Sequence, residues 1–304
     1  MMKLVEPTRD NIARAAAAIN SGLLVAMPTE TVYGLAADIR QDEAIAKIFL
    51  AKGRPAENPL IVHVASMEQA EQLGAWDVLS LRVAEMFWPG PISIVVPKQD
   101  HVSEHVTGGR NSIAIRHPDH PVAQKLIELC GPVAAPSANR FMALSPSSAE
   151  QVSDIIASCC ELILDGGPCQ VGIESTVITT VGEEVVILRP GQISRQMLEQ
   201  SSGVSVRQAS SAEKGQSPGN YPRHYAPRAR VRILAHVGSQ SGLVFGIPVM
   251  GQIQMSRSPG KYAAGLYNAL WTLDQTGVEE ILVESPPESE EWEAINDRLG
   301  KASS

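Results

Sequence analysis

Residues 23–38 read LLVAMPTETVYGLAAD, and this stretch decides the fold class. It opens with an uninterrupted apolar run, residues 23–27, which is typical of a strand buried on both faces of a sheet. Two threonines, a glutamate and a tyrosine follow directly. Open α/β sheets bind ligands at strand ends, so these side chains could line a binding edge, or they could simply cap a turn. Taken alone, the stretch favours the capped turn.

The chain around this stretch alternates predicted strands and helices up to about residue 200. Helices are expected at 11–19, 42–52, 67–73, 78–87, 120–129 and 147–157. Further strands are expected at 60–64, 92–96, 112–115, 133–135, 162–164, 176–180 and 185–188. This mixture predicts an α/β fold with a mixed, twisted sheet.

The composition changes near residue 201 and divides the chain. Residues 201–229 are rich in Ser, Gly and Pro, which is the composition of a linker. Beyond them, strands at 231–234, 243–249 and 280–284 and helices at 260–275 and 290–300 predict a compact βα module. We therefore expect a large α/β domain in residues 1–200, a linker in 201–229 and a small α/β domain in 230–304.

Composition also limits the classes of function. The formal net charge of −8 argues against nucleic-acid binding as the main role, because a polyanionic partner requires a basic surface. The four cysteines form no C-x-x-C pair, and no apolar stretch approaches the ~18 residues of a membrane-spanning helix. These features predict a protein of the reducing cytoplasm without a membrane segment.

Polar clusters follow several of the other predicted strands and helices. They comprise Lys52-Gly-Arg54 at a helix end, His63 within a strand, Arg116 at a strand end, and the Ser-Ala-Asn sequence of residues 137–139. Each has a structural explanation as well, such as a cation on a helix dipole, a buried strand histidine or a capped turn. Their combination instead predicts a pocket of hydroxyls, one histidine and several cations that can hold a polyphosphate and a small zwitterion.

Common catalytic and nucleotide motifs are absent from the sequence. It contains neither a G-x-x-x-x-G-K-S/T loop nor a G-x-G-x-x-G fingerprint, and neither a G-x-S-x-G elbow nor an H-E-x-x-H helix. The usual nucleotide cradles and the corresponding hydrolase classes are therefore disfavoured.

The clusters and their neighbours resemble a known family. The motifs PTETVYGL, KGRPAENPLIVHV, WPGPISIVV, IAIRHP, AAPSAN, GIESTV and LRPG follow in the order seen in the YrdC-like family. The later stretches SPGNYPRHYAP and LYNALWTLDQTGVEEILVE resemble the linker and C-terminal domain of its long form, the L-threonylcarbamoyladenylate synthases. The resemblance implies a twisted mixed-sheet YrdC-like domain with a concave cavity, and a small Rossmann-like α/β domain after the linker.

The resemblance also implies an activity. Members of the long form make L-threonylcarbamoyl-AMP from L-threonine, bicarbonate or CO2 and ATP, and they release pyrophosphate. Mg²⁺ is expected on the ATP phosphates and not on protein side chains. The product supplies a tRNA threonylcarbamoyl-transferase machinery, and direct tRNA binding is left open. Two alternatives are an RNA-binding YrdC-like module and a paralogue that acts in carbamoyl transfer during protein maturation.

Site residues carry over motif by motif. The positions implied for L-threonine are Thr31, His63, Arg116, Ala135 and Ser175. Those implied for ATP are Lys52, Arg54, Asn58, Ser112, Ser137, Asn139, Ser145, Arg189 and Tyr225. Lys52 and Arg54 are the residues expected to offset phosphate charge during the reaction. Because Tyr225 falls within the linker, the resemblance implies that this segment folds over the cavity as a lid.

Overall fold

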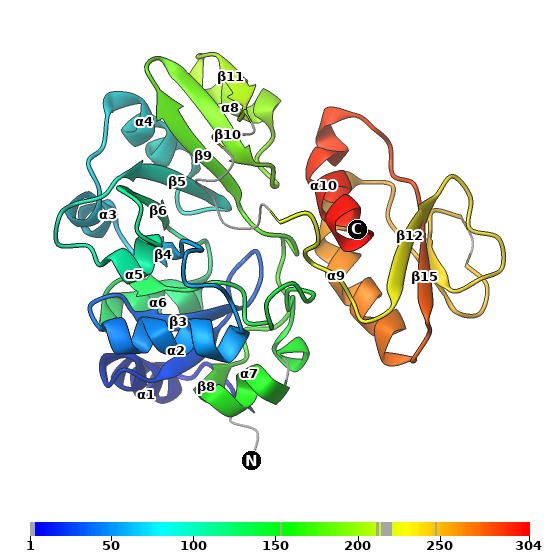
Figure 1. Ribbon diagram of the computed structural model, residues 1–304, viewed down its shortest axis with the longest axis horizontal. Coiled ribbons are helices and arrows are strands. Elements are labelled where there is room, and N and C mark those ends of the chain that lie inside the picture. The colour runs from blue at the N-terminus through cyan, green and yellow to red at the C-terminus, as the bar shows by residue number, and fades with distance from the viewer. Residues whose placement is uncertain (1–3, 153, 211–212, 214–220, 247) are drawn as a thin grey trace.

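Two sheets of unequal size organise the protein. The computed structural model describes residues 4–304 except 153, 211–212, 214–220 and 247. A large domain is built on an 11-stranded sheet and a small C-terminal domain on a 4-stranded sheet. The helices of the small domain face the large domain, and its strands lie beyond them (Figure 1).

The large sheet is mixed, as the sequence predicts. Its strands are, in spatial order, β1 (Leu4–Val5), β8 (Cys160–Leu164), β2 (Leu24–Met27), β3 (Gly34–Asp38), β7 (Val133–Ala134), β4 (Ile61–His63), β6 (Ser112–Arg116), β5 (Ile92–Pro97), β9 (Thr176–Val181), β10 (Glu184–Arg189) and β11 (Val206–Gln208). Strand β3 runs antiparallel to both of its neighbours, whereas β4 and β6 are parallel.

The helices of the large domain cover this sheet and match most of the predicted ranges. They are α1 (Arg9–Asn20), α2 (Asp42–Lys52), α3 (Met67–Leu73), α4 (Val78–Phe87), α5 (Glu104–Thr107), α6 (Pro121–Cys130), α7 (Asp154–Cys159) and α8 (Arg195–Ser202). Helix α2 ends at Lys52 because Gly53 adopts a left-handed conformation, with φ of 61°, at its C-cap.

The large domain differs from the predicted elements in several places. Strands β1 and β3 and helix α5 were not predicted. The helix expected at 147–157 is divided into a 3₁₀ turn, η1 (Ala149–Gln151), and α7. The Ser147 backbone N–H and hydroxyl both donate to Gln151 Oε1, and such local bonds compete with a continuous helix. The expected linker also begins too early, since α8 extends to Ser202 and β11 pairs in parallel with β10.

The small domain has an all-parallel sheet, with the order β12 (Arg230–Leu234), β15 (Glu280–Glu284), β13 (Gly242–Val244) and β14 (Gln252–Gln254). Its helices are α9 (Pro259–Gln275), η3 (Glu290–Trp292) and α10 (Glu293–Ala302). The strand predicted at 243–249 is shorter, ending at Val244, and β14 was not predicted.

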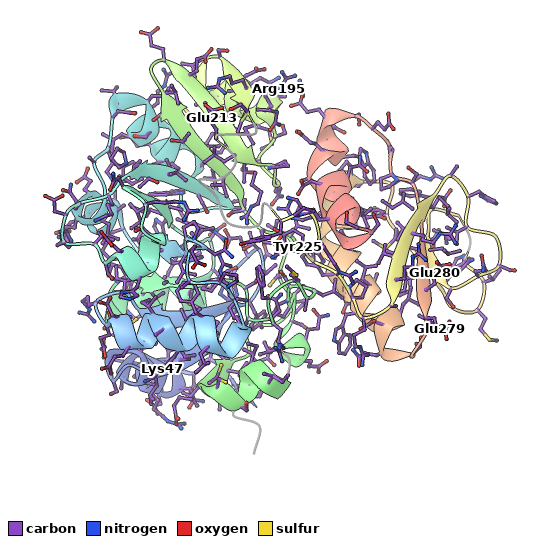
Figure 2. The ribbon with its side chains drawn as sticks, in the orientation of Figure 1. Lys47, Arg195, Glu213, Tyr225, Glu279 and Glu280 are labelled. Carbon is purple, nitrogen blue, oxygen red and sulfur yellow. The ribbon has the colours of Figure 1, made fainter. Side chains whose placement is uncertain are left out.

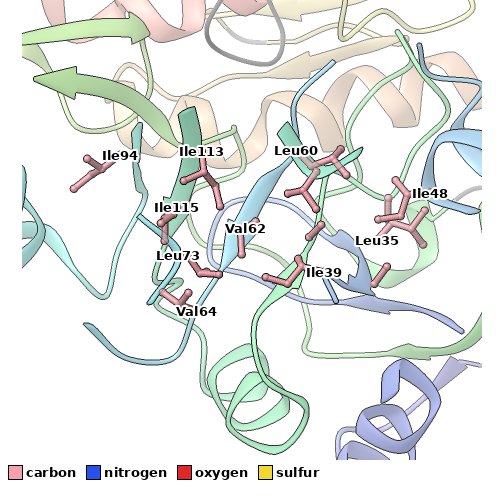
Figure 3. Packing of buried hydrophobic residues seen from close by; sticks show 14 of the residues in the cluster. Leu35, Ile39, Ile48, Leu60, Val62, Val64, Leu73, Ile94, Ile113 and Ile115 are labelled. Atoms are coloured by element: carbon pink, nitrogen blue, oxygen red, sulfur yellow. The ribbon is translucent and has the colours of Figure 1, made fainter. Parts of the chain in front are cut away.

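The main hydrophobic core lies against the large sheet and holds its strand ends in place. Figure 3 shows Leu35, Ile48, Val62 and Ile113 packed together, and all four are buried. Since these residues come from β3, α2, β4 and β6, the core fixes the strands that carry His63, Ser112 and Arg116 and the helix that ends at Lys52.

A second hydrophobic cluster joins the two domains. It combines the core of the small domain with Val32, Val171 and Ile173 of the large domain. The approach is close: a Cβ at Gly172 would lie 2.5 Å from the Ala264 Cα in α9. The loop before β9 therefore packs directly on a helix of the small domain.

None of the helices in the described part of the chain combines the length and the apolar character needed to cross a membrane.

Candidate functional site

A polar cavity lies where strands of the large sheet end and the linker passes. Its volume is about 60 Å³. The expected site residues in its wall are Thr31, Arg54, His63, Arg116, Ala135, Ser137, Ser175, Arg189 and Tyr225. The structure thus brings most of the motifs together, although they are far apart in the sequence.

The turn after β2 is a capped turn, and it also contributes Thr29 and Thr31 to the cavity wall. The Thr29 hydroxyl accepts hydrogen bonds of 3.2 Å from the backbone N–H groups of Thr31 and Val32, so Thr29 makes the capped turn. The Thr31 hydroxyl accepts a hydrogen bond of 2.8 Å from Arg116 Nη1. Arg116 Nη2 also lies 2.6 Å from the buried Glu30 carboxylate. This turn therefore orients the guanidinium of Arg116 in the cavity wall.

His63 lies beside Arg116, because the parallel register of β4 and β6 pairs these two residues. Its Nδ1 lies 3.3 Å from the Ile61 carbonyl oxygen. Burial and the Arg116 charge lower the pKa of His63 to about 3. The imidazole is therefore neutral at physiological pH.

Lys52 lies behind the cavity and not in its wall. Its ammonium donates to the backbone carbonyls of Ser137 and Asn139, the latter at 2.6 Å. Burial, with the charge of Arg54, lowers the pKa of Lys52 well below its usual range. The Lys52 ammonium therefore does not face the cavity, where a phosphate contact was expected. It connects the end of α2 to the Ser-Ala-Asn segment, residues 137–139.

Arg54 does face the cavity. Its Nη2 donates to the Pro59 carbonyl at 2.8 Å, and its buried Nε has no hydrogen-bond partner among the described residues. Burial lowers the pKa of Arg54 to about 10, so the guanidinium stays charged at neutral pH. A buried donor without a partner is suited to an anionic ligand.

Three other residues that were expected to contact ATP do not line the cavity: Asn139 and Asn58 bond to neighbouring loops, and Ser112 lies elsewhere. Asn139 is buried and its amide donates to the carbonyls of Arg140 and Ala143, so it shapes the loop. Asn58 Oδ1 accepts a hydrogen bond of 3.1 Å from the Tyr221 hydroxyl. Ser112 begins β6, at the opposite end from Arg116, and lines a separate hollow.

Glu174 is a cavity residue to which no role was assigned from the sequence, although it stands in the quoted GIESTV motif. Its Oε1 accepts from the Ser145 hydroxyl at 2.6 Å, and its Oε2 accepts from Arg298 Nε at 2.8 Å and the Tyr267 hydroxyl at 3.0 Å. Burial alone would raise the pKa of Glu174, but Arg298, Arg189 and Ser145 hold it at about 2. Glu174 is therefore a compensated anion.

The hydroxyls of Ser175 and Ser93 lie 2.8 Å apart in the buried wall. Arg189 Nη2 donates to the Ser175 carbonyl at 2.9 Å and to its hydroxyl at 3.2 Å. Ser93 was not identified from the sequence, because a serine within an apolar strand carries no distinguishing pattern.

Tyr225 closes the cavity from the linker side. It lies between the two domains (Figure 2). Neighbouring backbone bonds fix it, from His224 N–H to the Lys301 carbonyl and from Ala226 N–H to the Met142 carbonyl, both at 3.0 Å. The first part of the linker motif, residues 217–220, lies outside the described residues.

A protein-held metal ion does not fit this site. Among the described residues, no group of three or more His, Cys, Asp or Glu side chains is placed to bind one. Glu174 in the cavity wall already pairs with Arg298, and Glu30, which lies outside the wall, pairs with Arg116.

Two family models match the chain in succession. One, described as "Telomere recombination", matches residues 17–191. The other, described as "Threonylcarbamoyl-AMP synthase, C-terminal domain", matches residues 193–304.

Individual relatives match over nearly the whole length. Threonylcarbamoyl-AMP synthase of Pyrococcus abyssi is 39% identical over 95% of this chain and 93% of its own. The protein of the same name from Bacillus subtilis is 39% identical over 96% of this chain and 92% of its own. A crystal structure of P. abyssi Sua5 complexed with L-threonine superposes with a TM-score of 0.89 at 38% identity, covering 98% of this chain and 95% of that one.

Proposed function

Because the chain belongs to the two-domain threonylcarbamoyl-AMP synthase family, we propose that its cavity joins L-threonine, bicarbonate or CO2, and ATP. The protein is a threonylcarbamoyl-AMP synthase that acts in the threonylcarbamoyladenosine modification of tRNA. Neither the RNA-binding alternative nor the maturation paralogue accounts for a match that includes the C-terminal domain.

One observation carries the proposed placement of the substrates: the cavity wall combines Arg54, Arg116 and Arg189 with two neutral histidines, His63 and His224, and a carboxylate that is already paired. Such a wall attracts anions and leaves no uncompensated negative charge to repel them. The substrates bring a carboxylate, a carbamate and a triphosphate, which are the groups that guanidinium donors hold best.

L-Threonine is proposed to lie against Thr31, His63, Arg116, Ala135 and Ser175. Arg116 is the partner for its carboxylate. A neutral His63 contributes one donor and one acceptor and acts in binding, because a pKa of about 3 is too low for a general base at neutral pH.

ATP is proposed to lie against Arg54, Ser137, Arg189 and Tyr225. Asn58, Asn139 and Ser145 support this surface, and Lys52 holds the Ser137–Asn139 backbone in place. Ser112 would contact the nucleotide only if the ligand reached beyond the cavity toward the other end of β6.

The chemistry requires no nucleophile from the protein. The amine of threonine forms a C–N bond to CO2 and loses a proton to solvent; a carbamate oxygen then bonds the α-phosphorus of ATP, and pyrophosphate leaves. The site holds the two reactants together and offsets their charge. Mg²⁺ would enter on the ATP phosphates and lower the charge of the leaving pyrophosphate.

The linker is proposed to act as a lid. The cavity of about 60 Å³ is far smaller than the roughly 300–1,000 Å³ of typical ligand pockets, so the Tyr225 segment has to move for ATP to enter. Its return would exclude water from a carbamate that decomposes readily. We propose a catalytic domain up to β11, this linker, and a small domain that anchors it.

The proposed setting is the cytoplasm, where the product passes to a tRNA threonylcarbamoyl-transferase machinery. Direct contact of this protein with tRNA is not needed for the reaction itself. The formal charge of −8 favours transfer through the small-molecule product.

The experiment is an incubation of the full-length protein with ATP, Mg²⁺, bicarbonate and L-threonine. We expect pyrophosphate and threonylcarbamoyl-AMP in equal amounts, both dependent on threonine. The absence of threonine-dependent product would overturn the proposal. Arg54→Ala, with its unpartnered donor in the wall, should abolish turnover, whereas Ser112→Ala should leave most of it.

A further inference from the structure

Arg298 reaches the active site from the small domain. It lies in α10, and its side chain is fully buried. Nε donates to Glu174 at 2.8 Å, Nη2 donates to the Pro190 carbonyl at 3.0 Å, and the guanidinium carbon lies 5.0 Å from the centre of the Tyr225 ring. Glu174 and Tyr225 line the cavity, and Pro190 follows Arg189, which lines it as well.

The first effect of Arg298 is on charge. Of the described residues that line the cavity, Glu174 is the only one with a carboxylate. An unpaired carboxylate there would repel the phosphates of ATP and would carry a large desolvation cost. Arg298 supplies the opposite charge from the side away from the ligand, so that Arg54 and Arg189 remain directed to the nucleotide.

The second effect is on the position of Tyr225. Tyr225 has a backbone φ of 58°, which is uncommon for any residue other than glycine. Such a conformation persists only where the surrounding structure imposes it. The ring is held by His224, at 4.0 Å between ring centres, by Tyr267, stacked at 6.0 Å, and by the Arg298 cation. In a desolvated site a cation–π contact is among the stronger of these interactions.

We propose that Arg298 is a positioning residue of the active site, through which the small domain neutralises Glu174 and holds Tyr225 against the cavity. The inference rests on the proposed function, in which ATP lies beside Tyr225. It gives the small domain a specific role, because one of its side chains supports two residues of the proposed nucleotide-binding wall, Glu174 and Tyr225.

The first test does not depend on catalysis. Hydrogen exchange of the linker peptide, residues 221–229, is measured in the full-length wild type and in Arg298→Met. We expect the backbone amides of His224 and Ala226 to exchange about tenfold faster in the variant, the change that corresponds to losing one desolvated cation–π contact. Unchanged exchange would overturn the proposal.

A matched control separates this effect from a general weakening of the small domain. Arg232→Met removes another arginine of that domain, which pairs with Glu280 at 3.3 Å on the surface. Linker exchange should not change in this control. If Arg298→Met alone fails to fold, the Glu174→Gln/Arg298→Met double variant, which removes both members of the buried ion pair, carries the test, and its linker exchange must still rise.

The second test is kinetic. Arg298→Met should raise the KM for ATP about tenfold while the KM for L-threonine changes little, and Arg298→Lys should recover part of the loss because it keeps the cation. The effects of Arg298→Met and Tyr225→Ala on the KM for ATP should not add, since both remove the same contact. Additive effects would contradict the role. A wild type that makes no product would refute the proposed function, while the exchange result would still decide the role of Arg298.

Discussion

Lys52 Nζ donates a hydrogen bond of 2.6 Å to the backbone carbonyl oxygen of Asn139, deep inside the large domain. The two residues belong to different motifs, and the bond joins the end of α2 to the loop after β7. The lysine that the family resemblance implied would offset phosphate charge is therefore bonded to the backbone behind the wall that we propose for ATP.

Substituting Lys52 should therefore affect stability as well as activity. Lys52→Met leaves the part-buried carbonyl of Ser137 and the buried carbonyl of Asn139 without the Lys52 donor, and we expect the free energy of unfolding to fall by about 3 kcal/mol. Urea unfolding measures it. Lys47→Met is the control: Lys47 is an exposed residue of the same helix (Figure 2), and its Nζ donates to the Gly22 carbonyl. Lost turnover at unchanged stability would instead support a direct contact with phosphate.

Arg116 should distinguish the two substrates. Arg116→Lys keeps the positive charge but not the planar set of donors that holds Thr31 and Glu30 at once. We expect the KM for L-threonine to rise by about tenfold or more, with a small change in the KM for ATP. Steady-state kinetics with each substrate varied in turn provides the measurement. An equal rise in both constants would place Arg116 outside a dedicated threonine site.

His63 should make stability depend on pH. Its pKa is about 3 in the folded protein, so between about pH 3 and 6.5 the unfolded chain binds a proton that the folded protein does not. Stability is therefore lost as the pH falls below 6.5. Lowering the pH from 7 to 5 should cost about 2 kcal/mol through His63 alone.

His63→Gln is the variant that checks this dependence. The difference in the free energy of unfolding between pH 7 and pH 5 should be about 2 kcal/mol smaller than in the wild type. His224, with a pKa also lowered to about 3 by burial, is left unchanged and contributes equally to both proteins. The same pH dependence in both would show that His63 is not the group that titrates.

Gly172 should be required for the contact between the domains. In Gly172→Ala the new methyl group would lie 2.5 Å from the Ala264 backbone in α9, and φ is 75°. Gly182→Ala introduces the same left-handed strain, with φ of 60°, into a position with nothing within 4 Å. Thermal unfolding should show Gly172→Ala to be less stable than Gly182→Ala by about 2 kcal/mol. Equal losses would mean that the interface adjusts without cost.

Local sequence determined the helices and strands whose periodicity and end caps lie within the element itself. Helices α3 and α4 have the predicted bounds, residues 67–73 and 78–87, and α2 ends at Lys52 where Gly53 follows. The order of the short motifs was enough to indicate the family and both domains. These features depend on periodicity, caps and contiguous residues, all of which can be read along the chain.

Tertiary structure decided the rest. Residues 34–38, GLAAD, have weak strand propensity, yet they form β3 because β2 and β7 flank them in the buried sheet. Residues 206–208 have the composition of a linker but pair with β10. The lysine that binds the Ser137–Asn139 backbone, and the arginine in α10 that neutralises Glu174, acquire these partners only on folding. The physical reason is that a buried charge must find a partner in space, and sequence distance places no constraint on which residue supplies it.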